Sequence, residues 1–270
     1  MKKIAVYGKG GIGKSTTAAN VSAALAEQNY KICQIGCDPK NDSTRLLLGK
    51  ICPSTVLDCV KKYGDDILLE QILHYGYLDI KCAEAGGPEP GVGCAGRGII
   101  VALEKLKELN AVNECDYILY DVLGDVVCGG FAVPIREGYA SEIYIVSSGE
   151  LMSLYAANNI AKGIQRFANR GRVRLGGIIG NSRNIKNEKA LLEEFTKQIN
   201  SNLIAFIPRD EVVNQAEIHR KTVIEYAPDT PAAGVYRQLA QKIASNSDLT
   251  IPKPLSFDEL EKLVFEYGNK

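Results

Sequence analysis

The run Gly8-Lys9-Gly10-Gly11-Ile12-Gly13-Lys14-Ser15 fits the spacing G-x-x-x-x-G-K-[ST] of a phosphate-binding loop. An apolar, β-prone run at 3–7 precedes it, and an Ala-rich helical stretch that includes Thr16 follows it. Backbone N–H groups of such a loop turn inward around phosphate oxygens, and the helix N-terminus adds partial positive charge. We therefore expect residues 8–16 to bind a nucleoside triphosphate, with Lys14 at the terminal phosphates and the Ser15 hydroxyl on Mg²⁺.

Carboxylates follow two other apolar runs. Asp121 ends the run Ile118-Leu119-Tyr120-Asp121, which is typical of a Walker B strand, and would hold Mg²⁺ through water. Asp38 ends a second run and is a candidate for orienting the attacking water, with Lys40, Asp42 and Ser43 close behind it. Each acid could instead cap a helix or stabilise a turn.

Two further positions are candidates for contacts to the base of the nucleotide. Asn181 ends the apolar run near 174–179, and Asp210 lies in a Pro-Arg-Asp turn. Both therefore join the predicted ATP site.

The phosphate loop contains a second lysine, Lys9. It could serve its own nucleotide, reach the nucleotide of a partner subunit, or point into solvent, and the residues alone leave these open. The pattern KGGxGKST resembles the deviant Walker A motif of dimeric ATPases related to partitioning proteins. In that group this lysine contacts phosphates across the dimer interface, so the resemblance implies a catalytic role for Lys9.

The chain contains eight cysteines but no CxxC pair, and its two histidines are isolated, which argues against a disulfide framework or a closed zinc site. Cys94 and Cys128 differ from the rest because each lies in a glycine-dense loop. Two thiolates cannot complete a [4Fe–4S] cluster, but a symmetric dimer would supply four. Plain glycine turns remain the alternative.

Five segments resemble the nitrogenase iron protein family. They are 36–43, 86–98, 120–131, 155–159 and 223–226, and the two long ones contain Cys94 and Cys128. The likeness covers nearly the whole chain.

This resemblance implies an ATP-dependent oxidoreductase: a homodimer bridged by one [4Fe–4S] cluster, with MgATP bound to each subunit. It would take electrons from ferredoxin or flavodoxin and pass them singly to a catalytic metalloprotein, the nitrogenase catalytic component. Cys94 and Cys128 become the cluster ligands, and Asp38 and Asp125 become catalytic residues of the two switches. Arg97 matches the arginine at the partner-docking face, which in some members is ADP-ribosylated.

The elements that must position these residues alternate along the chain. Strands are predicted near 3–7, 31–36, 78–83, 117–120, 143–147, 174–179 and 203–207. Helices are predicted near 14–27, 55–62, 98–109, 151–168, 187–200, 231–244 and 257–267. Such alternation predicts an α/β fold, with a mostly parallel, doubly wound sheet flanked by helices, as in P-loop NTPases. No linker divides the chain, so we expect one domain over 1–270.

The composition limits the partners. Lys plus Arg and Asp plus Glu both number 32 in 270 residues, which gives no bulk attraction to nucleic acid. The first apolar run is too short for a signal peptide, and no stretch could span a membrane, so a cytoplasmic protein is expected.

Two other interpretations stay open. One is a nitrogenase-like reductase whose partner reduces a tetrapyrrole or a sulfur compound. The other, from a different class, is a partitioning or positioning ATPase, which would show a basic surface or an amphipathic C-terminal helix. The last predicted helix is acidic, which argues against membrane anchoring. A cluster carrier would be expected to show a CxxC pair.

Overall fold

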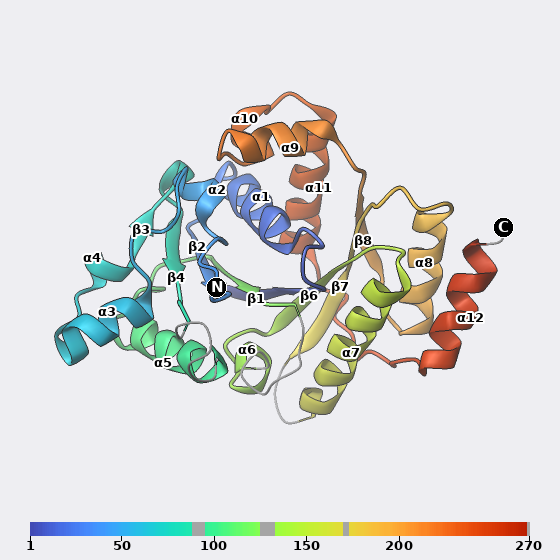
Figure 1. The fold of residues 1–270 in the computed structure, drawn as a ribbon, viewed down its shortest axis with the longest axis horizontal. Coiled ribbons are helices and arrows are strands. Elements are labelled where there is room, and N and C mark those ends of the chain that lie inside the picture. Colours follow the sequence, from blue (N-terminus) through green and yellow to red (C-terminus); the bar gives the residue numbers. More distant parts are fainter. Residues whose placement is uncertain (88–94, 125–132, 170–172, 269–270) are drawn as a thin grey trace.

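A computed structural model describes residues 1–87, 95–124, 133–169 and 173–268 (Figure 1). Its centre is an 8-stranded sheet of order β3-β4-β2-β5-β1-β6-β7-β8. Neighbouring strands run parallel, apart from β3, which pairs antiparallel with β4. The strands are β1 (Lys2–Tyr7), β2 (Ile32–Cys37), β3 (His74–Tyr75), β4 (Lys81–Glu84), β5 (Tyr117–Val122), β6 (Glu142–Ser147), β7 (Arg174–Asn181) and β8 (Leu203–Ile207).

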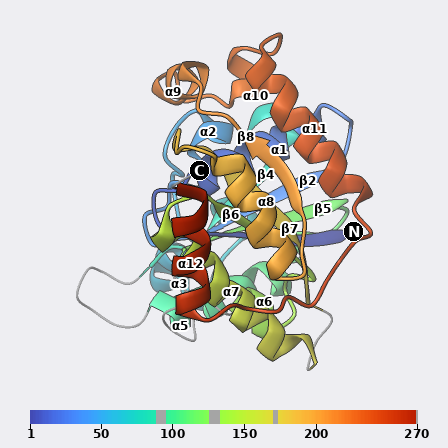
Figure 2. The same cartoon turned by 90° about the vertical axis from the view of Figure 1, so that its right-hand side faces the viewer.

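Helices cover both faces of this sheet (Figures 1 and 2). One face packs against α1 (Lys14–Ala26), α2 (Arg45–Leu48), α9 (Glu211–Ile218), α10 (Val223–Tyr226) and α11 (Pro231–Ser245). The other packs against α3 (Val56–Tyr63), α4 (Leu69–Ile72), α5 (Ala95–Glu108), α6 (Val133–Arg136), α7 (Leu151–Ala168), α8 (Glu188–Gln198) and α12 (Phe257–Gly268). Within the described ranges, none of these helices combines the length and apolarity needed to cross a bilayer.

The strand sequences explain this layering. Side chains alternate between the two faces of a strand, so Ile4 and Val6 of β1 enter the core beneath α1 while Ala5 and Tyr7 enter the other. The central strands β2, β5 and β6 are buried along their whole length, as a parallel sheet covered on both faces requires. The predicted α/β fold class is therefore confirmed.

The structure also corrects one predicted boundary and adds short elements. The strand predicted near 78–83 begins only at Lys81, because Leu78 and Asp79 adopt φ values of 50° and 59° in a 3₁₀ turn, Tyr77–Asp79. A second 3₁₀ turn covers Gly64–Asp66. These turns, the two-residue β3 and the short helices α2, α4, α6, α9 and α10 have too few residues to show a hydrophobic period.

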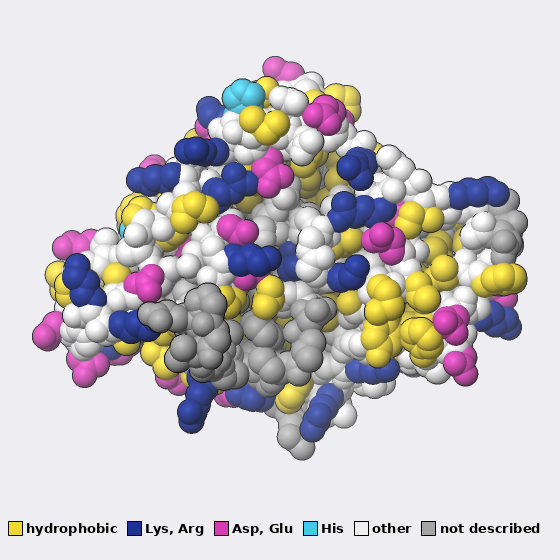
Figure 3. Space-filling view, in the orientation of Figure 1, with side chains coloured by type: hydrophobic (Ala, Val, Ile, Leu, Met, Phe, Trp, Pro, Cys, Tyr) yellow, Lys and Arg dark blue, Asp and Glu magenta, His cyan; other side chains and the backbone are white. Residues whose placement is uncertain are grey.

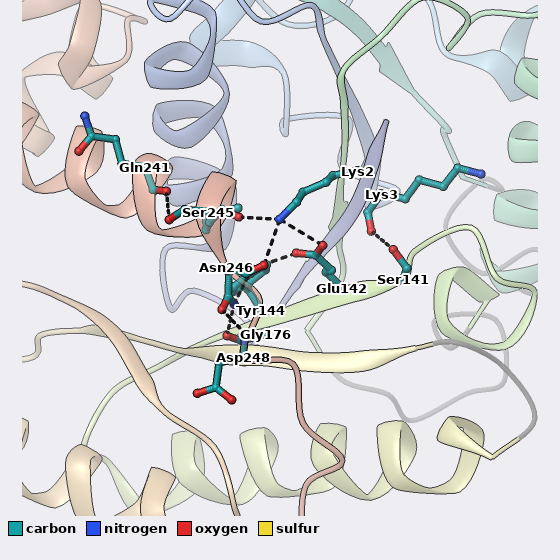
Figure 4. A network of polar contacts seen from close by, with 11 residues as sticks. Lys2, Lys3, Ser141, Glu142, Tyr144, Gly176, Gln241, Ser245, Asn246 and Asp248 are labelled. Atoms are coloured by element: carbon teal, nitrogen blue, oxygen red, sulfur yellow. Dashed lines mark hydrogen bonds and ion pairs between the residues drawn. The ribbon is translucent and has the colours of Figure 1, made fainter.

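The amino ends of β1, β6 and β7 are joined by a closed polar network (Figure 4). Lys2 Nζ lies 3.4 Å from Glu142 Oε1 and donates to two carbonyl oxygens at the end of α11, each at 3.2 Å. The Tyr144 hydroxyl donates to Glu142 Oε2 at 3.1 Å. Asn246 donates to the Tyr144 oxygen and to the Gly176 carbonyl at 3.0 and 2.8 Å. Each charged group here has partners within the fold.

Candidate functional site

The phosphate loop connects β1 to α1, and its shape depends on glycine. Gly8 and Gly13 have φ values of 146° and 93°, in the region that side chains rarely adopt. A Cβ on Gly8 would lie 2.2 Å from the Val146 carbonyl oxygen, and one on Gly13 would lie 2.5 Å from Asn181 Nδ2. The backbone of the loop can therefore approach its neighbours, and a phosphate, more closely than any other residue would allow.

Lys14 begins α1 and folds back over this loop. It is 8% exposed, and its Nζ donates to the Lys9 carbonyl oxygen at 3.2 Å. Ser15 and Thr16 follow in the first turn of α1 and are partly exposed. The ammonium group thus lies where a terminal phosphate bound by the loop would meet it.

Asp121 on β5 lies beneath the loop and is the strongest electrostatic feature of the site. It is 2% exposed, and neither of its carboxylate oxygens has a hydrogen-bond partner of normal geometry. Burial raises the pKa of Asp121, while the facing Ser15 hydroxyl, the Lys14 charge and the Ser43 hydroxyl act in the opposite direction. Oxygen ligands of this kind are what Mg²⁺ prefers, so Asp121 and Ser15 fit the cation that the sequence predicts.

The segment after β2 holds the predicted switch residues. Asp38 accepts the Lys40 backbone N–H at 3.0 Å, which folds the chain into a turn around the exposed Lys40. Ser43 is 1% exposed, and its oxygen accepts from Gln34 Nε2 at 3.1 Å. The backbone around Asp42 is therefore fixed at its Ser43 end and open to solvent at its Lys40 end.

The two predicted base contacts have local roles in this structure. Asn181 donates from Nδ2 to the Ile12 carbonyl at 2.7 Å, which ties β7 to the phosphate loop. Asp210 caps α9 by accepting the Val212 backbone N–H at 2.9 Å. Their remaining polar capacity faces the same cavity as the phosphate loop.

One cavity of about 430 Å³ gathers most of the predicted residues. Its lining includes Gly10, Gly11, Gly13, Lys14, Ser15, Thr16, Asp38, Lys40, Asp42, Asn181 and Asp210. Gly8, Lys9, Ile12, Ser43 and Asp121 do not line it; Ile12, Ser43 and Asp121 are buried behind it.

The cavity also includes residues that sequence reasoning missed. Arg183, directly after β7, donates to the Gly11 carbonyl of the phosphate loop. Arg209, Glu217 and Tyr236 complete the wall near Asp210. Arg183 could have been found from its position two residues after Asn181, at the carboxyl end of a strand. Tyr236 lies within α11, far along the chain, and has no such signal.

The predicted cluster ligands Cys94 and Cys128, and the catalytic candidate Asp125, lie outside the described residues. Arg97 is described and is exposed in the first turn of α5. Within the described ranges no group of three or more His, Cys, Asp or Glu side chains could hold a metal ion. A Cβ on Gly124 would lie 1.9 Å from the Gly8 carbonyl oxygen, so the chain leaving β5 packs directly on the phosphate loop.

Comparison with known proteins now places the chain. The family described as 4Fe-4S iron sulfur cluster binding proteins, NifH/frxC family, matches residues 2–270. The chain belongs to this family.

Solved structures with the same fold come from other ATPases. The septum site-determining protein MinD of Pyrococcus horikoshii, complexed with Mg-ADP, is 20% identical with a TM-score of 0.71 over 90% of this chain and 96% of its own. MinD of Aquifex aeolicus is 20% identical with a TM-score of 0.69 over 95% and 100%. A ParA family ATPase of Chlorobium tepidum is 22% identical with a TM-score of 0.67 over 90% and 98%. These likenesses show the P-loop NTPase fold.

These comparisons correct the narrower identification made from the sequence motifs. The chain was identified there as a nitrogenase iron protein, yet the structures that match it over most of its length are MinD and ParA ATPases. The nitrogenase reductase function, its oxidoreductase chemistry, the catalytic metalloprotein partner and the ferredoxin or flavodoxin donor are therefore wrong as predicted. The physical reason is that a phosphate loop on a doubly wound sheet is a scaffold common to many ATPases, so it does not specify a partner.

Proposed function

We propose that this protein is a MgATP-hydrolysing switch of the partitioning and positioning kind, in which bound ATP closes two chains against each other and hydrolysis releases them. The observation that carries the proposal is the buried Asp121 carboxylate, with both oxygens unpaired beneath a phosphate loop that contains Lys14 and Ser15. A carboxylate in that state costs free energy in the free protein, and a bound cation offsets that cost.

Each residue of the site has a part in this proposal. Backbone N–H groups of Gly10, Gly11 and Gly13 hold the phosphates, and the Lys14 ammonium neutralises the transferred group. Ser15 and Asp121 would hold Mg²⁺, which supplies charge neutralisation on the phosphates when bound. Asp38 would orient the attacking water.

Lys9 gives the proposal its dimeric form. Its carbonyl is held by Lys14 while its side chain remains partly exposed beside the phosphates. In a symmetric pair of chains it would reach the partner's nucleotide, as the deviant Walker A resemblance implies. Similarity to a MinD complexed with Mg-ADP and to a ParA family ATPase supports this choice of class.

ATP hydrolysis and light scattering with and without ATP test the proposal. Lys14→Ala should lose ATP binding, dimerisation and hydrolysis together. Lys9→Ala should keep ATP binding but lose dimerisation and most of the hydrolysis. Lys105→Met is a matched control, because Lys105 is also 8% exposed but lies on α5 and pairs with Glu108 at 2.8 Å. A wild-type chain that binds no ATP, or hydrolyses it equally well without Lys9, would refute the proposal.

The family description supports a second element, a [4Fe–4S] cluster held by Cys94 and Cys128 from each of two chains. The loops that contain these cysteines follow β4 and β5, which are the two neighbours of β2, so both loops leave the same edge of the sheet. Cysteine thiolates are the usual ligands of such clusters.

Metal analysis of anaerobically purified protein tests this element separately from ATP binding. About four iron atoms per two chains are expected, and Cys94→Ser or Cys128→Ser should lose them. The Lys14→Ala variant should keep its iron, which separates the two proposals. Protein purified without iron, and unable to take it up from iron and sulfide, would remove the cluster from the account.

A further inference from the structure

The amino edge of the sheet, opposite the phosphate loop, contains a pair of cysteines. Cys33 is the second residue of β2, and Cys115 lies in the turn that leads into β5. Both side chains enter the same core, and they share a side-chain hydrogen bond. All six described cysteines are free thiols.

Only one member of this pair can be reached from outside. Cys33 is fully buried, whereas Cys115 lines a surface cavity of about 480 Å³ together with Lys31, Lys81 and Glu114. Access for a small molecule therefore ends at the Cys115 sulfur, with the second thiol directly behind it.

The turn that holds Cys115 is fixed by a lysine. Lys81 Nζ donates to the carbonyl oxygens of Ala111 and Asn113 at 3.3 and 3.1 Å, which places its charge beside the turn. Lys81 pairs with Cys33 in the register between β2 and β4, so both side chains leave the sheet on the same face. Lys31, 3.8 Å from Glu114, brings a second positive charge to the cavity.

These surroundings favour a thiolate at one position alone. The Cys33 hydrogen bond, Lys81 and Lys31 lower the pKa of Cys115 to about 7, although burial and Asp116 act against them. Burial instead raises the pKa of Cys52 to about 11 and that of Cys82 well above its ordinary value. A thiolate is the nucleophile in thiol chemistry, so Cys115 should differ in reactivity from its neighbours.

We infer that Cys115 and Cys33 form a thiol–disulfide exchange site, with Cys115 as the attacking thiol and Cys33 as the resolving thiol, open to small organic disulfides. The Cys115 thiolate attacks the external disulfide, forms a mixed disulfide and releases one thiolate. Cys33 then loses its proton and attacks the Cys115 sulfur, which releases the second thiolate and forms the Cys33–Cys115 bond. The protein is oxidised by two electrons, and the external disulfide is reduced to two thiols.

The test treats folded, reduced protein with glutathione disulfide under anaerobic conditions, followed by alkylation and peptide mass spectrometry. Wild-type protein should yield a peptide linked through Cys33 and Cys115, which a dithiol reductant reverses. Cys33→Ser should stop at glutathione on Cys115, and Cys115→Ser should yield neither product. Cys52→Ser is the matched control and should behave like the wild type.

A second measurement excludes reaction through unfolding. Without disulfide present, Cys115 should be alkylated about tenfold or more faster than Cys52 at neutral pH, as the difference in thiolate fraction requires. Equal alkylation of Cys115, Cys52 and Cys82 would overturn the inference. So would wild-type protein that forms no Cys33–Cys115 link, or a Cys33→Ser variant that carries no glutathione on Cys115.

Discussion

The two edges of the sheet treat buried charge in opposite ways. At the amino edge, Lys2, Glu142 and Tyr144 form a closed network whose members have partners in the fold. At the carboxyl edge, Glu84 Oε2 and both Asp121 oxygens are buried without a partner. Orphaned polar atoms cost free energy, so their concentration at one edge identifies the edge that awaits a ligand.

Asn41 and Glu84 sharpen this contrast. The Asn41 side-chain oxygen is also buried and unpaired, and it lies in the switch segment after β2. Glu84 accepts from the Thr44 backbone N–H and hydroxyl through Oε1, both at 2.7 Å, yet leaves Oε2 unpaired. The hydroxyl of Thr250 is an orphan far from this edge, and nothing in the structure explains it.

The largest effect is expected for Asp121→Asn. The change removes a buried, unpaired negative charge, so the ligand-free protein should gain about 1–2 kcal/mol in free energy of unfolding. It should lose tenfold or more in affinity for MgATP, because a neutral amide is a weaker partner for Mg²⁺. Denaturant unfolding and calorimetric titration measure the two quantities.

The amino edge supplies the control. Glu142→Gln removes a paired charge, so it should lower stability by about 1–3 kcal/mol and leave MgATP binding unchanged. If Asp121→Asn destabilised the ligand-free protein as Glu142→Gln does, the proposed difference between the two edges would be wrong.

A pH dependence should distinguish Glu84. Burial raises the pKa of Glu84 to about 8, although its hydrogen bonds from Thr44 oppose the shift. The folded state therefore holds this proton longer than the unfolded chain does. Its stabilising contribution is present at low pH and is lost as pH rises from about 5 to about 8, a fall of about 2–4 kcal/mol.

Denaturant melts across this range, compared with those of Glu84→Gln, measure the effect. The variant should show a flatter profile, because glutamine cannot release a proton. A wild-type profile that rises through the same range, or that matches the variant, would contradict the assignment.

The smallest effect is expected at Lys2. Lys2→Met keeps an aliphatic stem but removes the ion pair with Glu142 and two hydrogen bonds to α11. Because Lys2 is partly exposed, about 1 kcal/mol of stability should be lost, with ATP hydrolysis unchanged. Loss of hydrolysis in a folded Lys2→Met protein would show that the two edges are coupled.

The sequence predicted the parts of this molecule that have a local signal. The strands near 143–147 and 203–207 and the helix at 151–168 match β6, β8 and α7, because long apolar runs and helical periods survive without tertiary information. The phosphate loop has fixed spacing, so Lys14 and Ser15 were found as well. Both belong to the cavity of about 430 Å³.

What the sequence did not predict depends on contacts across the fold. Tyr236 and Arg183 reach the cavity from α11 and from the end of β7, and the Cys33–Cys115 pair joins positions 82 residues apart (115 − 33). The partner was predicted wrongly because loop motifs describe local chemistry and not what the surface meets. Cys94, Cys128 and Asp125 stay predictions.

The most direct test of the central claim is the unfolding midpoint of the wild-type chain with ATP, in the presence of Mg²⁺ or of a chelator. The account predicts a clear rise with MgATP, a much smaller one with ATP and chelator, and none with either in Lys14→Ala, because a ligand stabilises the fold in proportion to its affinity. An equal rise with and without Mg²⁺, or a rise that persists in Lys14→Ala, would contradict it.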